Sequence, residues 1–333
     1  MKALLSEAPG GPDTLVLREI ADPAPAAGEV LIAIRACGVN YPDALIIEDK
    51  YQIRPPRPFA PGFELSGVIE ALGEGVTGLT VGQAVIAHTT HGGFAEKIVV
   101  SARACAPMPS GLSFELAAAV TLTYGTSLHA LQDRAALRAG EALLVLGAAG
   151  GVGLAAVEIG KALGARVIAA VSTEAKAAIA REHGADHAIV YPTHPSELKA
   201  LAALFKEACS AIGAKGGADV IYDPVGGDYA EAALRAIAWG GRYLIVGFPA
   251  GIPKIPLNLP LLKGASLCGV FWGTFLEHDP AGHQRNMARL LAWLADGTIK
   301  PKISARLPLP QGGEALNKLL RREAIGKIVV TLG

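Results

Sequence analysis

The sequence predicts an α/β protein in which a doubly wound parallel sheet is inserted into a mostly antiparallel β domain. Three features of the 333 residues support this fold class: an apolar run that breaks into regularly spaced glycines at 143–153, an alternation of strand-like and helical stretches after it, and short strands at both ends of the chain. Such alternation is typical of a parallel sheet with helices on both faces. A chain of this length also exceeds the usual size of a single core, which favours two domains.

The segment LLVLGAAGGVG at 143–153 predicts a buried strand, a tight turn and the start of a helix. Gly147 allows the sharp turn, Gly150 leaves room for a pyrophosphate beside the backbone, and Gly153 allows the helix to pack closely on the strand. Unpaired N–H groups at the helix start attract phosphate. A glycine-rich turn without a ligand is the alternative, but the strand–turn–helix context favours dinucleotide binding. The expected contacts are Gly147, Ala149, Gly150, Gly151, Val152 and Gly153.

The central region alternates between strands and helices. The expected strands are ALLVL at 142–146, RVIAAV at 166–171, HAIVY at 187–191, ADVIYD at 218–223, RYLIVGF at 242–248 and SLCGVF at 266–271. The expected helices are Val152–Leu163, Glu174–His183, Ser196–Ile212, Tyr229–Ala238 and His283–Ala295. This pattern predicts a parallel sheet.

The flanking regions have the character of a compact β domain. Short strands run from Lys2 to about Leu122, with a short helix and a Pro-rich loop within 40–57, and Ser113 is a candidate helix cap at the crossover. After Gly297 the chain returns to short strands around one helix, Gly313–Arg321. We therefore expect one domain at 1–122 completed by 298–333, and a nucleotide-binding domain at 123–297.

Composition narrows the classes of partner. Hydrophobic residues make up 51% of the chain, and 30 basic side chains balance 30 acidic ones. Without a basic patch or a long apolar run, neither a nucleic acid nor a membrane is an expected partner. The four cysteines form no C-x-x-C pair, which favours reduced thiols and a cytoplasmic location.

The end of the second strand, in ARVIAAVSTEAK, indicates which nucleotide binds. An acidic residue there would accept hydrogen bonds from the ribose of NAD, whereas this chain has Ser172 and Thr173, with Glu174 just beyond. Lys176 and the two hydroxyls can instead contact a 2′-phosphate, and a charge-assisted hydrogen bond contributes about 1.5–3 kcal/mol. We therefore expect NADPH. The alternative is that Lys176 is a solvated surface lysine.

Several motifs together resemble one known family. They are ACGVNYPD (36–43), PFAPGFELSGVIEALGEGV (58–76), GAAGGVG (147–153), YDPVGG (222–227) and GKIVV (326–330). In this order they are similar to the medium-chain dehydrogenase/reductase superfamily, and within it to the zinc-independent quinone oxidoreductase or zeta-crystallin-like branch. The resemblance spans essentially the whole chain, and it implies a GroES-like catalytic domain that carries an inserted Rossmann domain.

The resemblance also implies roles for individual residues. Asn40, Asp43 and Tyr51 would face the nicotinamide, and Thr126 would contact the cofactor near the nicotinamide ribose. Lys176 and Tyr191 match positions that take the 2′-phosphate in relatives that use NADPH. Residues that would line the cofactor cleft are Val225, Phe248, Phe271, Trp272 and Lys327. For Val225, Phe248 and Phe271, an ordinary place in the core is the alternative.

The same resemblance argues against a metal. Zinc-dependent relatives have a cysteine where this chain has Asn40 and a histidine where it has Phe63, and neither replacement is a zinc ligand. They also carry a lobe with four cysteines that this chain lacks. His88 and His91 lie close together in sequence, but polar lining or exposure is the expected role of both.

The expected reaction is hydride transfer from NADPH to a quinone or another α,β-unsaturated carbonyl, with hydrogen bonds from Asn40 and Tyr51. A conjugated acceptor can delocalise the incoming charge without a metal. Reduction of an enoyl thioester is one alternative, and a non-catalytic NADPH-binding role, crystallin-like or RNA-associated, is another. In relatives, the edge strand that corresponds to 266–271 joins two subunits, and the segment 257–273 of this chain is apolar beyond what one strand needs, so the resemblance implies a homodimer. Burial of that segment within its own domain is the alternative.

Overall fold

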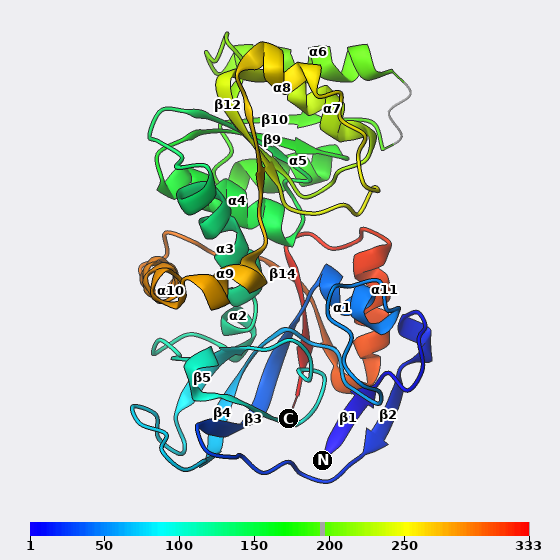
Figure 1. Cartoon of the computed structure of the whole chain (residues 1–333), viewed down its shortest axis with the longest axis vertical. Coiled ribbons are helices and arrows are strands. Elements are labelled where there is room, and N and C mark those ends of the chain that lie inside the picture. Colours follow the sequence, from blue (N-terminus) through cyan, green and yellow to red (C-terminus); the bar gives the residue numbers. More distant parts are fainter. Residues whose placement is uncertain (194–196, 333) are drawn as a thin grey trace. The chain divides into compact units, whose positions relative to one another are not determined.

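The computed structural model describes residues 1–193 and 197–332. The chain forms two compact units, Met1–Leu122 with Pro301–Gly333 and Thr123–Lys300 (Figure 1). Each unit has its own hydrophobic core, built on its own sheet.

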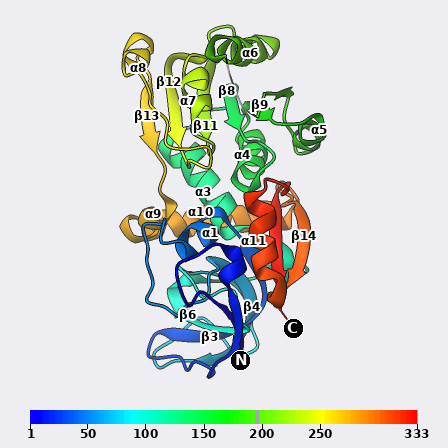
Figure 2. The ribbon, with the colours of Figure 1, turned by 90° about the vertical axis from the view of Figure 1, so that its right-hand side faces the viewer.

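The second unit contains a six-stranded sheet in the order β10-β9-β8-β11-β12-β13 (Figure 2), and every adjacent pair is parallel. The strands are β8 (Ala142–Leu146), β9 (Arg166–Val171), β10 (His187–Val190), β11 (Ala218–Asp223), β12 (Ile237–Ile245) and β13 (Ser266–Gly269). The chain moves outward from β8 to β10 and then returns to place β11 beside β8. With right-handed crossovers, this reversal puts helices on both faces of the sheet. The predicted doubly wound parallel sheet is confirmed.

Helices connect and follow these strands. They are α3 (Thr121–Leu128), the π-helical turn η3 (His129–Arg134), α4 (Gly151–Ala162), α5 (Glu174–Glu182), α6 (Leu198–Ala211), α7 (Asp228–Leu234), α8 (Asn258–Lys263), α9 (Trp272–His278) and α10 (Pro280–Ala295). The side chains of Leu144, Ile168 and Ile221 in the central strands are fully buried. Burial on both faces explains why these strands are apolar without alternation.

The first unit is built on a seven-stranded sheet in the order β14-β15-β3-β4-β5-β7, with β6 paired to β3 and a separate β1-β2 pair. The strands are β1 (Lys2–Leu5), β2 (Val16–Glu19), β3 (Glu29–Val39), β4 (Glu64–Leu72), β5 (Ala84–His88), β6 (Lys97–Ser101), β7 (Cys105–Pro107), β14 (Ile303–Pro308) and β15 (Lys327–Thr331). Its helical segments are α1 (Tyr41–Ile47), α2 (Phe114–Ala117), α11 (Gly312–Leu320) and the 3-10 turns η1 (Pro12–Thr14), η2 (Ala102–Ala104) and η4 (Leu309–Gln311). All pairs except β14–β15 are antiparallel, as the sequence predicts.

Two predicted helices have different limits in the structure. The expected helix Tyr229–Ala238 is too long, because α7 ends at Leu234 and β12 begins at Ile237. Its alanines favour a helix by propensity, but the carbonyl of Ala236 accepts a hydrogen bond of 2.9 Å from Ala218 as β11 and β12 begin to pair. The helix expected from His283 begins earlier, since Asp279 caps it through the backbone N–H of Gly282 at 2.8 Å.

Three further expectations concern the ends of elements. The strand expected to reach Phe271 ends at Gly269, and the chain continues into the unpredicted helix α9. The helix expected from Ser196 is present from Leu198, and Ser196 itself lies outside the described residues. Ser113 caps α2 as expected, because its hydroxyl accepts a hydrogen bond of 3.3 Å from the backbone N–H of Leu116.

Candidate functional site

The glycine turn after β8 has a geometry that larger residues could not adopt. Gly147 has a φ of +57°, the left-handed region that favours glycine. A Cβ atom on Gly153 would lie 2.2 Å from the carbonyl oxygen of Gly147, so helix α4 packs directly on the turn. A Cβ on Gly147 would lie 2.9 Å from the side chain of Val225, which brings the YDPVGG loop against the turn. The glycines at these positions are therefore required by close packing.

The start of α4 presents unused hydrogen-bond donors. Gly150 is the N-cap residue, and its carbonyl accepts from Leu154 at 2.8 Å. Within the described residues, the backbone N–H groups of Gly151, Val152 and Gly153 have no acceptor. Three unpaired N–H groups and the positive end of a 12-residue helix form a site suited to phosphate.

The end of β9 gathers the residues predicted to select the nucleotide. Thr173 caps α5, with its hydroxyl 3.3 Å from the backbone nitrogen of Lys176. The same helical turn places the Lys176 ammonium 3.3 Å from the hydroxyl of Ser172. The nearby acid, Glu174, is exposed and forms an ion pair with Arg181 at 3.3 Å. The end of β9 therefore carries the Lys176 ammonium and the Ser172 hydroxyl side by side, and the Glu174 carboxylate is paired with Arg181.

The remaining cofactor positions differ in their exposure. Tyr191 is buried in the core of the second unit, with its ring 4.9 Å from that of Tyr229. Phe248 and Phe271 are 41% and 46% exposed, so the alternative that they are core residues is wrong. Val225 is half-buried, and Trp272 is buried.

One of these residues, Trp272, packs against a glycine of helix α3. The indole of Trp272 lies 2.9 Å from where a Cβ on Gly125 would be, and the half-buried Thr126 is the next residue along α3. The fold therefore brings Trp272 against the segment of α3 that carries Thr126, although 146 positions separate the two residues in the sequence.

The YDPVGG loop is held by a buried carboxylate that sequence reasoning did not single out. Asp223 accepts hydrogen bonds from the backbone N–H groups of Val225 and Gly226 at 2.8 and 2.9 Å. The hydroxyl of Tyr243 donates to it at 2.5 Å. Burial raises the pKa of Asp223, and these hydrogen bonds oppose that shift. The signal in the sequence was an acidic residue at the end of an apolar strand, directly before Pro and two glycines.

In the first unit, Asn40 and Asp43 begin helix α1. The backbone N–H of Asn40 donates to one carboxylate oxygen of Asp43 at 2.7 Å, and the backbone N–H of Gly62 donates to the other at 2.7 Å. Asp43 is fully buried, and this burial raises its pKa to about 7 against the opposing effect of the two hydrogen bonds. Asp43 thus fixes two backbone segments beside Asn40.

A buried ion pair lies next to these residues. The Lys327 ammonium is 2.6 Å from a carboxylate oxygen of Glu64, 2.6 Å from the amide oxygen of Asn40 and 3.0 Å from the carbonyl of Val39. Lys327 and Glu64 are only 3% and 0% exposed. The other oxygen of Glu64 accepts from the backbone N–H of Leu122 at 2.8 Å. Sequence reasoning did not single out Glu64, because its partner Lys327 is 263 positions away in the sequence.

The amide of Asn40 is fully engaged in this network. Its NH₂ group donates to Glu64 at 2.9 Å and to the carbonyl of Gly38 at 3.1 Å. Both amide hydrogens are therefore used within the protein, and the expectation that Asn40 donates to a substrate is wrong for this arrangement. The buried Glu64 carboxylate explains one of these two hydrogen bonds, since a buried charge needs hydrogen-bond partners.

Tyr51 is the predicted catalytic residue that retains an available donor. Its ring packs edge-on against Phe63, with 5.6 Å between the ring centroids. Among the described residues, nothing accepts from or donates to its hydroxyl. Burial, and to a lesser extent the charge of Asp43, raise the pKa of Tyr51, so the phenol keeps its proton.

The resemblance would place zinc ligands at Asn40 and Phe63, and both residues have other contacts. The amide oxygen of Asn40 accepts a hydrogen bond from Lys327, and the phenyl ring of Phe63 packs against Tyr51. Across residues 1–193 and 197–332, no group of three or more His, Cys, Asp or Glu side chains is arranged to hold a metal ion. His91 forms a hydrogen bond of 3.0 Å with the hydroxyl of Thr90, and burial lowers its pKa.

Comparison with known proteins identifies the class to which this fold and site belong. Residues 26–110 match the family described as alcohol dehydrogenase GroES-like domain, and residues 151–295 match the family described as zinc-binding dehydrogenase. The chain is a medium-chain dehydrogenase/reductase. Within that superfamily it belongs to the quinone oxidoreductase branch, as its relatives show.

Three of these similar proteins illustrate the relationship. The chain is 37% identical over 306 residues to quinone oxidoreductase-like protein 2 homolog of Nematostella vectensis, covering 91% of this chain and 81% of the relative. The quinone oxidoreductase of Thermus thermophilus, solved also in complex with NADPH, is 32% identical, with a TM-score of 0.86 and full coverage of both chains. A mycobacterial protein solved in complex with NADPH is 28% identical, with a TM-score of 0.92 and full coverage of both chains.

These comparisons settle the general chemistry. The family consists of oxidoreductases that depend on NAD(P) and act on small molecules. No helix in the described part of the chain is long and apolar enough to cross a membrane.

Proposed function

We propose that this protein transfers hydride from NADPH to a quinone or another α,β-unsaturated carbonyl. The observation that carries the proposal is the Lys327–Glu64–Asn40 cluster, in which a buried carboxylate is paired with an ammonium group and an amide, and no metal-holding group of side chains is found among the described residues. An isolated carbonyl needs a strong electrophile for reduction, whereas a conjugated acceptor spreads the incoming charge over its own atoms. The names of the relatives support the same class of substrate.

The residues of the second unit fit a dinucleotide. A side chain at Gly147 or Gly153 would clash with its neighbours, and the N–H groups of Gly151, Val152 and Gly153 have no acceptor among the described residues and are available for a pyrophosphate. Ser172 and Lys176 would hold the 2′-phosphate that distinguishes NADPH from NADH. Two neighbours solved with NADPH support that choice.

When bound, NADPH supplies the hydride, and the chain supplies position and a proton donor. Tyr51 donates a hydrogen bond to the oxygen on which charge develops, since its raised pKa keeps the phenol protonated. Asn40 acts as a positioning residue, because it connects the Lys327–Glu64 pair to the start of α1. Asp43 fixes the Gly62 backbone beside that helix.

A comparison of three acceptors tests the proposed substrate class. Purified protein is mixed with NADPH and, in separate reactions, 1,4-benzoquinone, 9,10-phenanthrenequinone or crotonyl-CoA, and the nicotinamide absorbance is followed. We expect oxidation with a quinone. Oxidation with the thioester alone would favour the enoyl-thioester reductase, and no oxidation with any acceptor would favour the non-catalytic NADPH-binding role.

Replacement of one lysine tests the proposed cofactor. Lys176→Ala should weaken NADPH binding about tenfold and leave NADH binding unchanged, because one charge-assisted hydrogen bond to phosphate is lost. Lys199→Ala, at an exposed position of α6, is the matched control. Equal weakening of both nucleotides would remove the phosphate role from Lys176.

We also propose that the protein forms a homodimer through the edge of the second unit's sheet. β13 is the edge strand, and α8 precedes it with Leu261 and Leu262 exposed by 78% and 68%. Leu257 is 72% exposed, so the alternative that this segment is buried within its own domain is wrong. Apolar side chains beside an unpaired strand favour association.

Sedimentation of a charged variant tests the dimer. Leu261→Asp combined with Leu262→Asp should convert the dimer to a monomer, because two carboxylates would be buried without partners. Val81→Asp, on an apolar side chain of the first unit that is 62% exposed, is the control. A wild-type protein that sediments as a monomer would contradict the proposal.

A further inference from the structure

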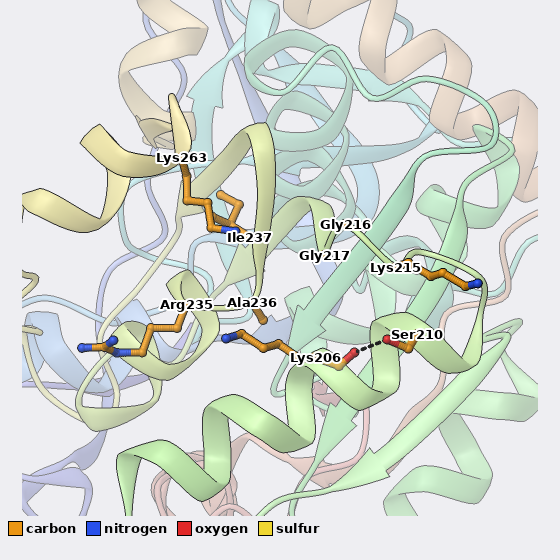
Figure 3. Close-up of a pocket in the computed structure, with 9 residues that line it drawn as sticks. All are labelled: Lys206, Ser210, Lys215, Gly216, Gly217, Arg235, Ala236, Ile237 and Lys263. Atoms are coloured by element: carbon orange, nitrogen blue, oxygen red, sulfur yellow. Dashed lines mark hydrogen bonds between the residues drawn. The ribbon is translucent and has the colours of Figure 1, made fainter.

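A basic pocket lies within the second unit, away from the glycine turn. Its volume is about 160 Å³, and its charged and polar lining consists of Lys206 and Ser210 from α6, Lys215, Arg235 and Lys263 (Figure 3). Gly216, Gly217, Ala236 and Ile237 complete the lining. Four cationic side chains therefore line one small concavity.

This pocket and the predicted cofactor site lie at opposite ends of the parallel strands of the same sheet. Gly216–Gly217 directly precede β11, and Ile237 is the first residue of β12, so the pocket lies at the amino ends of these parallel strands. The glycine turn follows the carboxyl end of β8. Since β11 has six residues, the amino and carboxyl ends of the strands are roughly 20 Å apart. A ligand in the pocket would not overlap a nucleotide at the turn.

Three of the four cationic side chains of the pocket have no counter-charge among the described residues. Lys206, Lys215 and Lys263 form no ion pair among the described residues, whereas Arg235 is 2.6 Å from the carboxylate of Glu231. The whole chain is neutral, with 30 basic and 30 acidic side chains, so this accumulation is a local property. Like charges that face one concavity repel each other, and a bound anion relieves that repulsion.

The pocket also offers backbone donors and an open approach. The backbone N–H groups of Lys215 and Gly216 have no acceptor among the described residues. A Cβ atom on Gly216 would meet nothing within 4 Å, so a ligand can approach this loop closely. The volume of about 160 Å³ corresponds to roughly five water molecules. That is less than the usual size of a pocket for a drug-sized ligand, which starts at about 300 Å³.

We propose that this pocket binds a small phosphate anion, inorganic phosphate or pyrophosphate, independently of the cofactor. Lys206 and Lys263 are the principal ligands, because in Figure 3 their ammonium groups lie on either side of the backbone at Ala236–Ile237, whereas Lys215 extends away. Lysine binds phosphate as a point charge, without the bidentate geometry of arginine.

Calorimetric titration with sodium phosphate and with sodium pyrophosphate tests the proposal. At low ionic strength the full chain should bind one of them, and added salt should weaken that binding. The double variant Lys206→Gln/Lys263→Gln should weaken it by about tenfold for each lysine removed. Lys199→Gln changes an exposed lysine two turns earlier on the same helix, and it should bind as the wild type does.

A second titration separates this pocket from the predicted cofactor site. With NADPH present in excess, the affinity for the anion should be unchanged, and the double variant should keep the wild-type affinity for NADPH. Competition between the anion and NADPH would overturn the proposal, because the anion would then be at the glycine turn. Equal anion binding by the wild type and the double variant, or no binding by the wild type, would overturn it as well.

Discussion

Removal of the Lys327 ammonium is the sharpest test of the buried cluster in the first unit. In Lys327→Met, a side chain of similar length loses its charge and three hydrogen bonds of 2.6 to 3.0 Å. Glu64, which is fully buried, would keep only its hydrogen bonds from Asn40 and the Leu122 backbone. Breaking a buried pair by removing one partner costs about 3–5 kcal/mol. We expect a loss of that size in the free energy of unfolding.

Urea unfolding followed by circular dichroism measures this loss, and a second substitution shows its origin. Adding Glu64→Gln to Lys327→Met removes the uncompensated charge and should recover part of the stability, with a coupling of about 1–3 kcal/mol. Lys2→Met, at an exposed position of the same unit, should change stability by less than about 0.5 kcal/mol. If Lys327→Met were as mild as Lys2→Met, the ion pair would not hold this site together.

Three further perturbations probe the individual parts. The folded state retains the proton of Asp43 up to about pH 7, whereas an unfolded aspartate loses it near pH 4, so stability from this group falls as pH rises between those values. Asp43→Asn should flatten that slope in unfolding titrations, and an unchanged slope would assign it to another group. Gly153→Ala places a Cβ 2.2 Å from the Gly147 carbonyl and should cost about 3 kcal/mol in thermal unfolding, while Gly273→Ala, with open space around it, should be tolerated. Tyr51→Phe should lower kcat for quinone reduction at least about tenfold with unchanged stability, and full activity would exclude Tyr51 as the donor.

Much of the architecture could be predicted because local patterns and the fold agree. The apolar runs of β8, β9 and β11 are continuous because both faces of the sheet are covered, and the glycines at 147 and 153 mark a turn that only small residues permit. Predictions failed where pairing overrides propensity. The alanines before Trp239 favour a helix, but Ile237 pairs with β11 as the first residue of a strand.

The two aromatic residues Phe248 and Phe271 show a different limit. From sequence alone they are equally compatible with a core position and with a cofactor contact. Their exposure of 41% and 46% excludes the core. Hydrophobicity does not decide this question, because much of a folded protein's surface is apolar.

The sequence by itself determined the inserted nucleotide-binding sheet, the glycine turn and the Ser172–Lys176 strand end. These follow from residue type and spacing, which act locally. Only the tertiary structure decided that Lys327 neutralises Glu64, since 263 positions separate them and no pattern predicts the contact. The tertiary structure also decided that the Asn40 amide donates to Glu64 and to the Gly38 carbonyl, whereas the Tyr51 hydroxyl has no partner among the described residues. Burial is the physical reason, because a charge removed from water requires specific partners, and only the folded chain brings those partners together.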